Sequence, residues 1–436
     1  MASELDTIVA PATPLGRGAL AIVRIDGPRS GAILETLSGV SPDARHATLT
    51  QLSLDGEPLD ECVAIRYAAP HSFTGNDLVE LTPHGSPLLV ERVIAAIVAC
   101  GARLAEPGEF TERAVLNGKL DLVQAESIAD LINSRTALQA KLSLGNLHGV
   151  LSRRAAAVRE SLLHVISRLE AALDFSEEGY EFITRDDAKR EIERAIADTE
   201  ALAETYRRGR ATNEGLTAVI LGRPNAGKST LLNRLVGSDR AIVTPIPGTT
   251  RDIVRETIEI GGLPVTIADT AGLRTSGDVV EGIGVARARE AAASADIILY
   301  LVDASVGLTS DDELDAFPGA MVIYSKSDLA PAPADALGIS VTAETGIAEL
   351  LSRLDLLVRE EFAAPEGSLV NERQRQAVLG CNEALAAALA SLTAGLDEPV
   401  ILVDLYRGAN SLGLLTGAIT QEHVFTEIFS KFCIGK

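Results

Sequence analysis

A phosphate-binding loop constrains the fold of this chain more than any other feature of its sequence. Residues 222–229 read Gly-Arg-Pro-Asn-Ala-Gly-Lys-Ser, a complete match to the pattern G-x-x-x-x-G-K-S/T. The apolar run 216–221 before the loop predicts a buried strand, and residues 229–236 after it predict a helix. This order places backbone N–H groups and a helix N-terminus around a phosphate. The loop therefore predicts a nucleoside triphosphate site in an α/β domain.

Three further motifs follow in the order in which GTPases carry them, at residues 248–250, 269–272 and 325–328. We expect the Lys228 ammonium to reach the β- and γ-phosphates and the Ser229 hydroxyl to bind Mg²⁺. Together the four motifs predict a site that binds a guanine nucleotide with magnesium and hydrolyses it.

The two middle motifs are predicted to contact the γ-phosphate and the magnesium ion. A hydroxyl at Thr250 can complete the magnesium shell and sense the γ-phosphate, although Gly-Thr-Thr taken alone also suits a simple turn. The Asp269 carboxylate suits the outer magnesium shell, and the Gly272 N–H can meet the γ-phosphate.

The residue that orients the attacking water is not where Ras-like proteins carry it. Leu273 occupies that position, and an apolar side chain cannot polarise water. Glu281 and Arg274 are the candidates in the following stretch, against the alternative of an ordinary solvated carboxylate. No arginine finger is evident, and the Asn225 oxygen with carbonyls of residues 244–249 could hold a monovalent cation instead. The alternative for Asn225 is a cap of the loop.

The guanine motif departs from the usual Asn-Lys-x-Asp at its first residue, which is Ser325. Asp328 can accept from the N1–H and amine of guanine, a donor pair that adenine lacks. Lys326 can lie over the base. Because Ser325 lacks the amide that braces the base pocket, we expect guanine choice to persist with weaker affinity. The segment 342–344, which is Thr342, Ala343 and Glu344, could supply an N–H to guanine O6.

The remaining sequence divides into an N-terminal α+β part and helices on both sides of the α/β part. Strands are expected at 20–25, 62–67 and 77–81, and a helix at 88–100. Apolar residues at helical spacing predict long helices across 151–173, 186–206, 378–392 and 412–419. The helix before the phosphate loop is expected to break between Gly209 and Gly215. Within the α/β part, strands are expected at 254–260, 263–268, 296–302, 321–325 and 337–341, the first two as a hairpin around Gly261 and Gly262.

We interpret this pattern as a multidomain α/β protein with an inserted domain. Residues 1–118 form an α+β domain, and 119–210 with 363–436 form a discontinuous all-α domain. Residues 211–362 form the doubly wound, Ras-like GTPase domain inserted into it. The alternative is two unrelated helical regions.

Composition limits the partners and the compartment. The net charge is −22 and aromatic residues make up 3%, which argues against non-specific coating of nucleic acid and against base-stacking platforms. The 4 cysteines form no C-x-x-C pair, which argues against a zinc site or a disulfide framework. No apolar run is long enough to span a bilayer, and the start lacks a signal-peptide pattern. We therefore expect a cytoplasmic protein that is not associated with a membrane.

Short motifs outside the GTPase domain are spread from one end of the chain to the other. These motifs are Asp6-Thr7-Ile8-Val9-Ala10, Pro14-Leu15-Gly16-Arg17-Gly18, Ser72-Phe73-Thr74-Gly75, His84-Gly85, Asn117-Gly118-Lys119-Leu120-Asp121-Leu122 and Phe432-Cys433-Ile434-Gly435-Lys436. With these motifs and its GTPase domain, the chain resembles from end to end the MnmE/TrmE family of tRNA-modifying GTPases.

The resemblance implies a specific function and set of partners. It implies a homodimer joined through folate-binding N-terminal domains, with GTPase domains that pair when potassium binds. It implies an FAD-dependent partner of the MnmG/GidA type in a heterotetramer, and tRNA as the substrate. The complex would add a (carboxymethyl)aminomethyl group to C5 of the wobble uridine, using a tetrahydrofolate derivative in its 5-formyl or methylene form.

The resemblance also assigns roles to single residues. The residues that match potassium ligands are Asn225, Thr244, Ile246 and Thr249. Those that match magnesium contacts are Ser229 and Thr250, and Glu281 matches the residue that orients the attacking water. Beside these, the motifs themselves predict catalytic roles for Lys228, Thr250 and Gly272 and nucleotide contacts at Ala226, Gly227, Thr230 and Asp269. The folate contacts match Arg24, Glu80, Lys119 and Lys436.

Two other functions remain to be weighed. A ribosome-assembly GTPase switch that binds RNA without modifying it would have a similar GTPase domain, but such proteins usually carry an RNA-binding module after it. A folate-dependent aminomethyl transferase with a vestigial GTPase domain is the other alternative. The intact Lys228, Ser229 and Thr250 argue against a vestigial domain.

Overall fold

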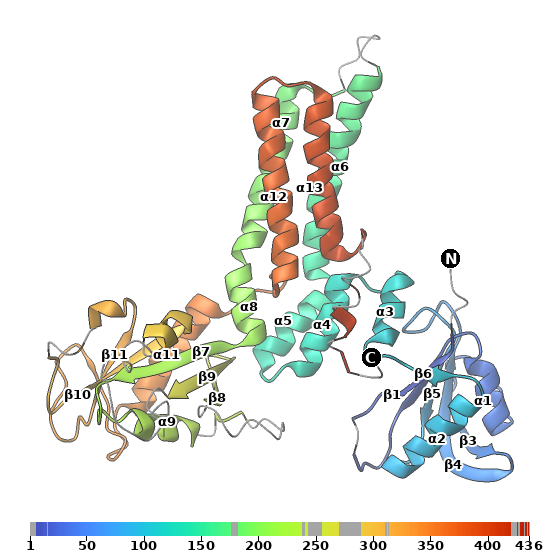
Figure 1. The fold of residues 1–436 in the computed structure, drawn as a ribbon, viewed down its shortest axis with the longest axis horizontal. Coiled ribbons are helices and arrows are strands. Elements are labelled where there is room, and N and C mark those ends of the chain that lie inside the picture. Colours follow the sequence, from blue (N-terminus) through green and yellow to red (C-terminus); the bar gives the residue numbers. More distant parts are fainter. Residues whose placement is uncertain are drawn as a thin grey trace. The chain divides into compact units, whose positions relative to one another are not determined.

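The computed structural model describes residues 6–14, 16–175, 182–237, 240–242, 255–269, 289–309, 312, 314–419, 425, 428–430, 432–433 and 435. By its internal contacts the chain divides into two compact units, Met1–Ala129 with Leu412–Lys436, and Asp130–Ser411. Each unit is described by itself (Figure 1).

A six-stranded sheet forms the centre of the first unit, in the order β3-β4-β5-β2-β1-β6. Its strands are β1 (Ile8–Pro11), β2 (Val23–Asp26), β3 (Thr48–Leu54), β4 (Glu57–Tyr67), β5 (Leu78–Thr82) and β6 (Arg103–Leu104). The helices are α1 (Ser30–Ser38), α2 (Pro87–Ala99), α3 (Glu109–Leu116) and the start of α4 (Leu122–Asn133). The expected α+β character is confirmed, except that the strand expected from residue 20 begins at Val23.

One face of this sheet is covered by α1 and α2, and the other face carries polar side chains. Val23 and Ile25 of β2 belong to the core shared with α1 and α2. Because side chains alternate along a strand, Arg24 lies on the opposite face. There it stands beside Glu80 of β5, its partner in the antiparallel register.

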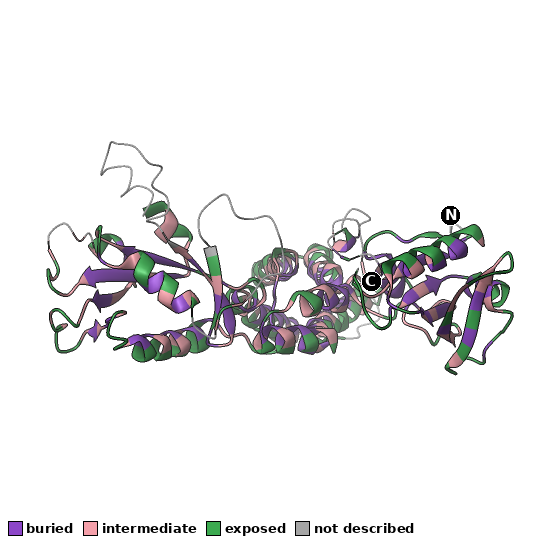
Figure 2. Ribbon diagram, turned by 90° about the horizontal axis from the view of Figure 1, so that it is seen from below, coloured by how far each residue is buried: buried purple, intermediate pink, exposed green. Residues whose placement is uncertain are grey.

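The second unit contains a group of long helices. They are α5 (Ala137–Leu147), α6 (Val150–Asp174), α7 (Arg185–Glu204), α8 (Tyr206–Glu214), α12 (Glu372–Thr393) and most of α13 (Glu398–Thr416). The predicted stripe of α6 is buried at Leu151, Val158, Leu162 and Leu169. Figure 2 shows the buried faces of the helices turned toward one another and the exposed faces outward.

The expected helix break between Gly209 and Gly215 is confirmed at its far end, because α8 continues through Gly209 to Glu214 and β7 begins at Leu216. A Cβ at Gly209 would lie 1.9 Å from the Leu369 carbonyl oxygen. The glycine therefore allows the segment after the α/β part to pass close to α8, and does not end the helix.

A second six-stranded sheet forms the α/β part, in the order β12-β11-β10-β7-β9-β8. Its strands are β7 (Leu216–Gly222), β8 (Arg255–Ile260), β9 (Leu263–Asp269), β10 (Ile297–Asp303), β11 (Met321–Ser325) and β12 (Leu337–Gly338). Every pairing is parallel except that of β8 with β9. One face packs against α9 (Lys228–Val236) and α11 (Ile347–Phe362). This is the expected doubly wound architecture, with the strand order reversing at β7.

The expected hairpin is confirmed, and the last strand is shorter than expected. Gly261 and Gly262 connect β8 to β9 with φ values of 61° and 89°, the left-handed pair that a tight hairpin turn requires. The chain leaves β12 after Gly338, because Ser340 pairs with Thr345 in a separate antiparallel bridge that turns it back.

The chain enters and leaves the α/β part through two segments that are bonded together. Thr212 of α8 donates from its hydroxyl to the Phe362 carbonyl oxygen at 3.1 Å and accepts from the Ala364 N–H at 3.0 Å. Arg208 donates to the Glu360 carbonyl oxygen at 2.8 Å.

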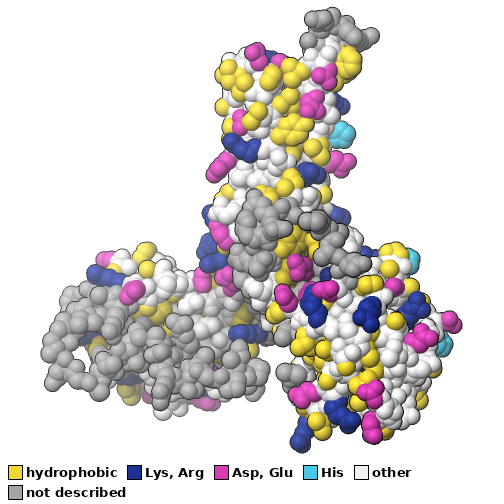
Figure 3. Space-filling model, turned by 45° about the vertical axis from the view of Figure 1, so that its right-hand side comes forward, with side chains coloured by type: hydrophobic (Ala, Val, Ile, Leu, Met, Phe, Trp, Pro, Cys, Tyr) yellow, Lys and Arg dark blue, Asp and Glu magenta, His cyan; other side chains and the backbone are white. Residues whose placement is uncertain are grey.

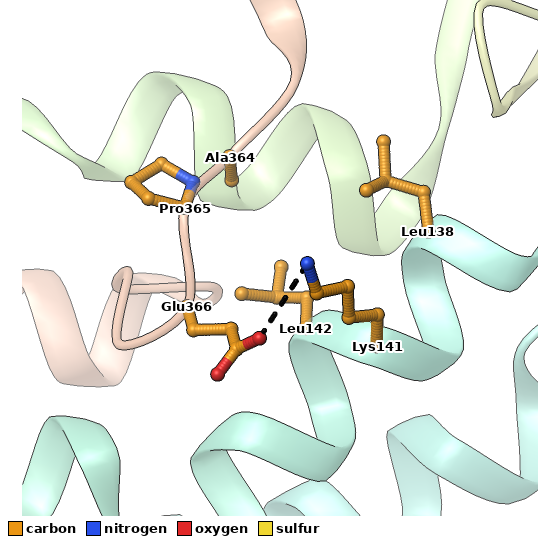
Figure 4. Close-up of a pocket in the computed structure, with 6 residues that line it drawn as sticks. All are labelled: Leu138, Lys141, Leu142, Ala364, Pro365 and Glu366. Atoms are coloured by element: carbon orange, nitrogen blue, oxygen red, sulfur yellow. Dashed lines mark ion pairs between the residues drawn. The ribbon is translucent and has the colours of Figure 1, made fainter.

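A cavity of about 260 Å³ lies beside the segment that leaves the α/β part, and an ion pair of 3.7 Å between Lys141 and Glu366 crosses it (Figure 4). Its lining residues are Leu138, Lys141, Leu142, Ala364, Pro365 and Glu366. None of these was predicted to bind nucleotide or folate.

Surface apolar side chains occur along α13, where Val403 is 68% exposed and Val400 47%. Figure 3 shows hydrophobic side chains among charged ones on the helical part of the surface. Across the described residues, no helix combines the length and apolar character needed to cross a bilayer.

Candidate nucleotide-binding site

The predicted nucleotide motifs gather at the carboxyl edge of the α/β sheet. In the strand register, Gly222 of β7 lies opposite Leu301 of β10, and Asp303 lies opposite Ser325 of β11. The backbone of Asp269 ends β9 beside Ile220 of β7. This edge, at the strand where the order reverses, is where open α/β sheets bind ligands.

The phosphate loop depends on glycines and on a lysine that folds back over it. Gly222 has φ 133°, and a Cβ there would lie 2.2 Å from the Leu301 carbonyl oxygen. Gly227, with φ 92°, precedes the first turn of α9. The Lys228 ammonium donates to the carbonyl oxygens of Gly222 and Arg223, both at 2.8 Å. Ser229 and Thr230 are exposed in the first turn of α9.

Ser325 retains a brace between the guanine motif and the phosphate loop. Its buried hydroxyl oxygen lies 2.7 Å from the Ala226 carbonyl oxygen and 3.2 Å from that of Val302. The hydroxyl of this short side chain therefore reaches the loop directly, and the weaker guanine affinity expected from the missing amide stays a prediction. Asp328 stands exposed three residues later.

Backbone conformations with positive φ occur in three of the predicted motifs. Asn225, Lys326 and Glu344 have φ values of 64°, 55° and 55°. Such values are uncommon for residues with a side chain, and they cluster at sites where backbone geometry serves a ligand.

The last predicted nucleotide segment follows β12. The Ala343 N–H donates to the Ser340 hydroxyl at 3.0 Å, and the Glu344 carboxylate lies 3.5 Å from the guanidinium of Arg234 on α9. Thr342 lies in the same turn. The amide predicted for guanine O6 thus has a partner within its own loop.

Several predicted site residues lie outside the described residues. They are Thr244, Ile246, Thr249, Thr250, Gly272, Leu273, Arg274, Glu281 and Lys436, and for Asp269 only the backbone is described.

The first unit brings two of the predicted folate residues together on the sheet face opposite α1 and α2. Arg24 Nε lies 2.8 Å from Glu80 Oε1, and the Tyr67 hydroxyl donates to Glu80 Oε2 at 3.3 Å. The Arg24 guanidinium lies over the Phe73 ring at 5.5 Å. Burial, with the nearby charge of Glu80, raises the pKa of Tyr67.

The third folate residue, Lys119, is held by the loop that carries Phe73. Its ammonium donates to the Pro70 carbonyl oxygen at 2.8 Å. Asn117 donates from its amide to the Thr74 carbonyl oxygen at 2.7 Å. The motifs at 72–75 and 117–119, distant in sequence, therefore meet beside the polar sheet face.

A buried ionic network that sequence reasoning missed supports this loop. Arg113 of α3 donates to Asp26 Oδ1 at 2.9 Å and to Glu109 Oε1 at 2.8 Å. Asp26 in turn accepts from the Thr74 hydroxyl and from the Asn76 amide. The only sequence signal was the spacing of Glu109 and Arg113 on one helix face.

The end of the chain reaches the same unit. A Cβ at Gly435, which has φ 95°, would lie 2.0 Å from the Pro11 carbonyl oxygen at the end of β1. Gly108 is similarly close to Phe429, with 2.8 Å to its carbonyl oxygen. Glycines at these positions let the C-terminal segment pack against β1 and α3.

Comparison with known proteins places the whole chain in one family. Residues 7–119 match the family described as GTP-binding protein TrmE N-terminus, and residues 122–433 match the MnmE helical domain. The tRNA modification GTPase MnmE of Koribacter versatilis is 42% identical over 99% of this chain and 99% of its own length. The MnmE of Xanthomonas campestris pv. campestris is 40% identical over 100% of both chains.

Among solved structures, the Era protein of Aquifex aeolicus matches 39% of this chain and 66% of its own at 24% identity. Its TM-score of 0.25 is too low to bear on function. Identity of about two residues in five along the full length, in contrast, defines a family, and this chain belongs to the MnmE (TrmE) family of tRNA modification GTPases.

Proposed function

We propose that this chain hydrolyses GTP as part of a complex that modifies the wobble uridine of tRNA. The observation that carries the proposal is the convergence of the phosphate loop, the end of β9 and the guanine motif at one sheet edge. Full-length similarity to MnmE proteins supports the tRNA-modifying role.

In this proposal each described motif has a defined task. The loop amides and the N-terminus of α9 bind phosphate oxygens. Lys228 exchanges the carbonyls of Gly222 and Arg223 for the β- and γ-phosphates. Asp328 accepts from guanine, and its exposure leaves it accessible to the base. Glu281, Thr250 and Gly272 are proposed from sequence to orient water and to contact the γ-phosphate.

The donor sets fit the two metal ions. Ser229 and Thr250 hydroxyls are the hard oxygen donors that Mg²⁺ prefers, and the ion would neutralise charge on the phosphates. Asn225, whose left-handed backbone lies in the loop, would hold K⁺ with oxygens of Thr244, Ile246 and Thr249. The ion would supply the positive charge that no arginine finger provides.

We infer that the polar face of the first unit binds a tetrahydrofolate derivative in its 5-formyl or methylene form. Glu80 suits the donor pair of a pterin, and Arg24 fixes the carboxylate from one side. Lys119 and Lys436 would pair with the glutamate tail. Gly435, which precedes Lys436 in the sequence, packs against the Pro11 carbonyl of this unit.

The proposed assembly is a homodimer with an FAD-dependent partner of the MnmG/GidA type, acting on tRNA in the cytoplasm. The proposed domains are 1–118 for folate and dimerisation, 119–210 with 363–436 as a helical domain, and 211–362 as the GTPase.

Mass spectrometry of wobble nucleosides tests the function. Cells that lack this protein should accumulate wobble uridine without the C5 substituent, and restoring the chain should restore the modified nucleoside. Unchanged wobble nucleosides in the deletion would instead favour a GTPase switch in ribosome assembly.

The proposed cation gives a sharper test in vitro. GTP turnover should be at least about tenfold faster in potassium than in sodium, because removing one group that stabilises the transition-state charge typically costs about that or more. Glu281→Ala should slow hydrolysis in potassium while leaving GDP affinity unchanged. Equal turnover in the two salts would rule out the cation.

A further inference from the structure

We propose that Asp303 is a positioning residue of the nucleotide site, whose carboxylate fixes the Lys326 side chain in the orientation that receives guanine. The inference rests on the proposed function, because it concerns the same base motif. It adds a residue that lies outside the four GTPase motifs.

The carboxylate of Asp303 is itself held in one orientation. Asp303 ends β10 directly opposite Ser325, the last residue of β11. One oxygen, Oδ1, accepts from the Ser305 N–H at 3.0 Å and from the Ser305 hydroxyl at 2.6 Å. The other oxygen, Oδ2, lies 2.6 Å from the Lys326 ammonium nitrogen. With both oxygens engaged, the carboxylate cannot rotate without losing a partner.

Lys326 is fixed at its backbone end as well as at its ammonium end. Its φ of 55° is a left-handed conformation, and the Leu329 N–H donates to its carbonyl oxygen at 2.9 Å. The neighbouring Ser327 N–H donates to the Ile339 carbonyl oxygen at 3.0 Å. The methylene stem of Lys326 between these two fixed ends is therefore already ordered before a base binds.

Binding of a base to a flexible Lys326 would cost the conformational entropy of that side chain. When the methylene stem is already ordered, this cost is smaller. Immobilising a rotamer-rich side chain is one of the standing costs of binding, and a side chain that is already ordered avoids it. The Ser325 hydroxyl is directed to the carbonyls of Ala226 and Val302. Ser325 therefore does not hold Lys326. The Lys326 ammonium is paired with Asp303 at the end of β10, so Asp303 is the group that fixes the position of Lys326.

The same pair accounts for the ionisation of Asp303. Burial acts to raise the pKa of this carboxyl, but hydrogen bonds from Lys326 and Ser305 lower it below its ordinary value. The Asp303 carboxyl is thus ionised at neutral pH, the state in which it accepts from Lys326.

A double-mutant cycle tests the inference on the full-length chain, with GDP affinity measured by calorimetry. Asp303→Asn should weaken GDP binding about five- to tenfold, since an amide keeps the shape but not the charge. In the Lys326→Ala background the same change should have no further effect. Asp303→Glu, which keeps the charge, should restore most of the affinity lost in Asp303→Asn.

The matched control is Asp296→Asn, at the residue that precedes the opposite end of the same strand. Asp296 accepts from the Thr217 N–H at 2.9 Å, and its replacement should leave GDP affinity unchanged. The inference is overturned if Asp303→Asn leaves GDP affinity unchanged or raises it, or weakens it equally in both backgrounds. Failure of the unaltered chain to bind GDP would overturn the proposed function and this inference with it.

Discussion

At the scale of single residues, Ser325 shows how a shorter side chain maintains a contact between two motifs. The phosphate loop and the guanine motif come from strands that are not consecutive in sequence. The Ser325 hydroxyl bridges them through the Ala226 carbonyl oxygen, and a Cβ at Gly227 would lie 4.0 Å from the Ser325 Cβ. The loop thus lies close enough for the short Ser325 side chain to reach it.

Replacing Ser325 by alanine should weaken GDP binding about fivefold. The change leaves the buried Ala226 carbonyl without this donor, a loss of about 1 kcal/mol. Calorimetry with GDP measures the effect. Ser327→Ala, in the same motif but partly exposed, is the control and should bind GDP as the unaltered chain does. Equal affinity of both variants would mean that the bridge has no part in nucleotide binding.

At the scale of elements, α3 carries two carboxylates, Glu109 and Glu112, whose pKa values are shifted in opposite directions. Burial acts to raise the pKa of Glu109, but hydrogen bonds from Arg103 and the Glu106 N–H, with the charge of Arg113, lower it below its ordinary value. Burial and the charges of Glu109 and Glu106 raise the pKa of Glu112.

We expect Glu109→Gln to destabilise α3 at pH 7 by about 2–3 kcal/mol, because it removes one of the two carboxylate partners of the buried Arg113 guanidinium. A lowered pKa gives stability that is present above the unfolded value, about 4.3, and is lost as pH falls through the folded value. The difference from the unaltered chain should therefore shrink in acid. Hydrogen exchange of the α3 amides, followed from pH 7 down to about pH 3 so that the series extends below the unfolded value, measures it.

Glu112→Gln is the matched variant and should have the opposite sign. A carboxyl with a raised pKa loses stability as pH rises through its folded value, so the neutral amide should stabilise α3 at pH 7 and make no difference in acid. Destabilisation by both variants at pH 7 would show that helix packing, not charge, dominates.

Two glycines within helices allow a second test at this scale. Gly209→Ala in α8 should destabilise the second unit by several kcal/mol, roughly as overpacking does, because its Cβ would meet a backbone carbonyl at 1.9 Å. A Cβ at Gly408 in α13 would have no neighbouring atom closer than 3.6 Å. Gly408→Ala should therefore be neutral or stabilising by about 0.5–1 kcal/mol. Thermal unfolding of the two variants compares them, and an unchanged midpoint for Gly209→Ala would contradict the close approach.

At the scale of the whole molecule, the second unit joins a helical part to an α/β part through two adjacent segments. Thr212 bonds to the carbonyl of Phe362 and to the N–H of Ala364 with one hydroxyl. Gln139 of α5 donates to the Asn213 carbonyl oxygen at 2.8 Å, and Gly262 of the β8–β9 turn lies against Leu138 of α5. These contacts connect the α/β sheet with helices that precede it in sequence.

Thr212→Val should loosen this joint without unfolding either part. The change removes a buried hydroxyl that serves two backbone groups and should cost about 1–3 kcal/mol locally. Hydrogen exchange at residues 362–371 should speed up accordingly. Thr217→Val, at an exposed position of the otherwise largely buried β7, is the control, and equal exchange in both variants would show that the hydroxyl does not hold the segments together.

The sequence by itself determined the class of site and most of the elements. Hydrophobic periodicity and turn glycines identified α6, α9, α2 and the β8–β9 hairpin, because these are local properties. The phosphate loop and Asp328 were readable for the same reason, since each motif is contiguous in the chain.

Only the tertiary structure decided which distant residues meet. The closeness of Leu369 to Gly209, the reach of Ser325 to Ala226, and the buried pairing of Arg113 with Asp26 join segments far apart in sequence. Whether a glycine ends a helix or allows another segment to pack closely depends on which residues pack against it. Whether a charged side chain is solvated or paired depends on which groups lie next to it. Those facts belong to the packed molecule, and no local pattern encodes them.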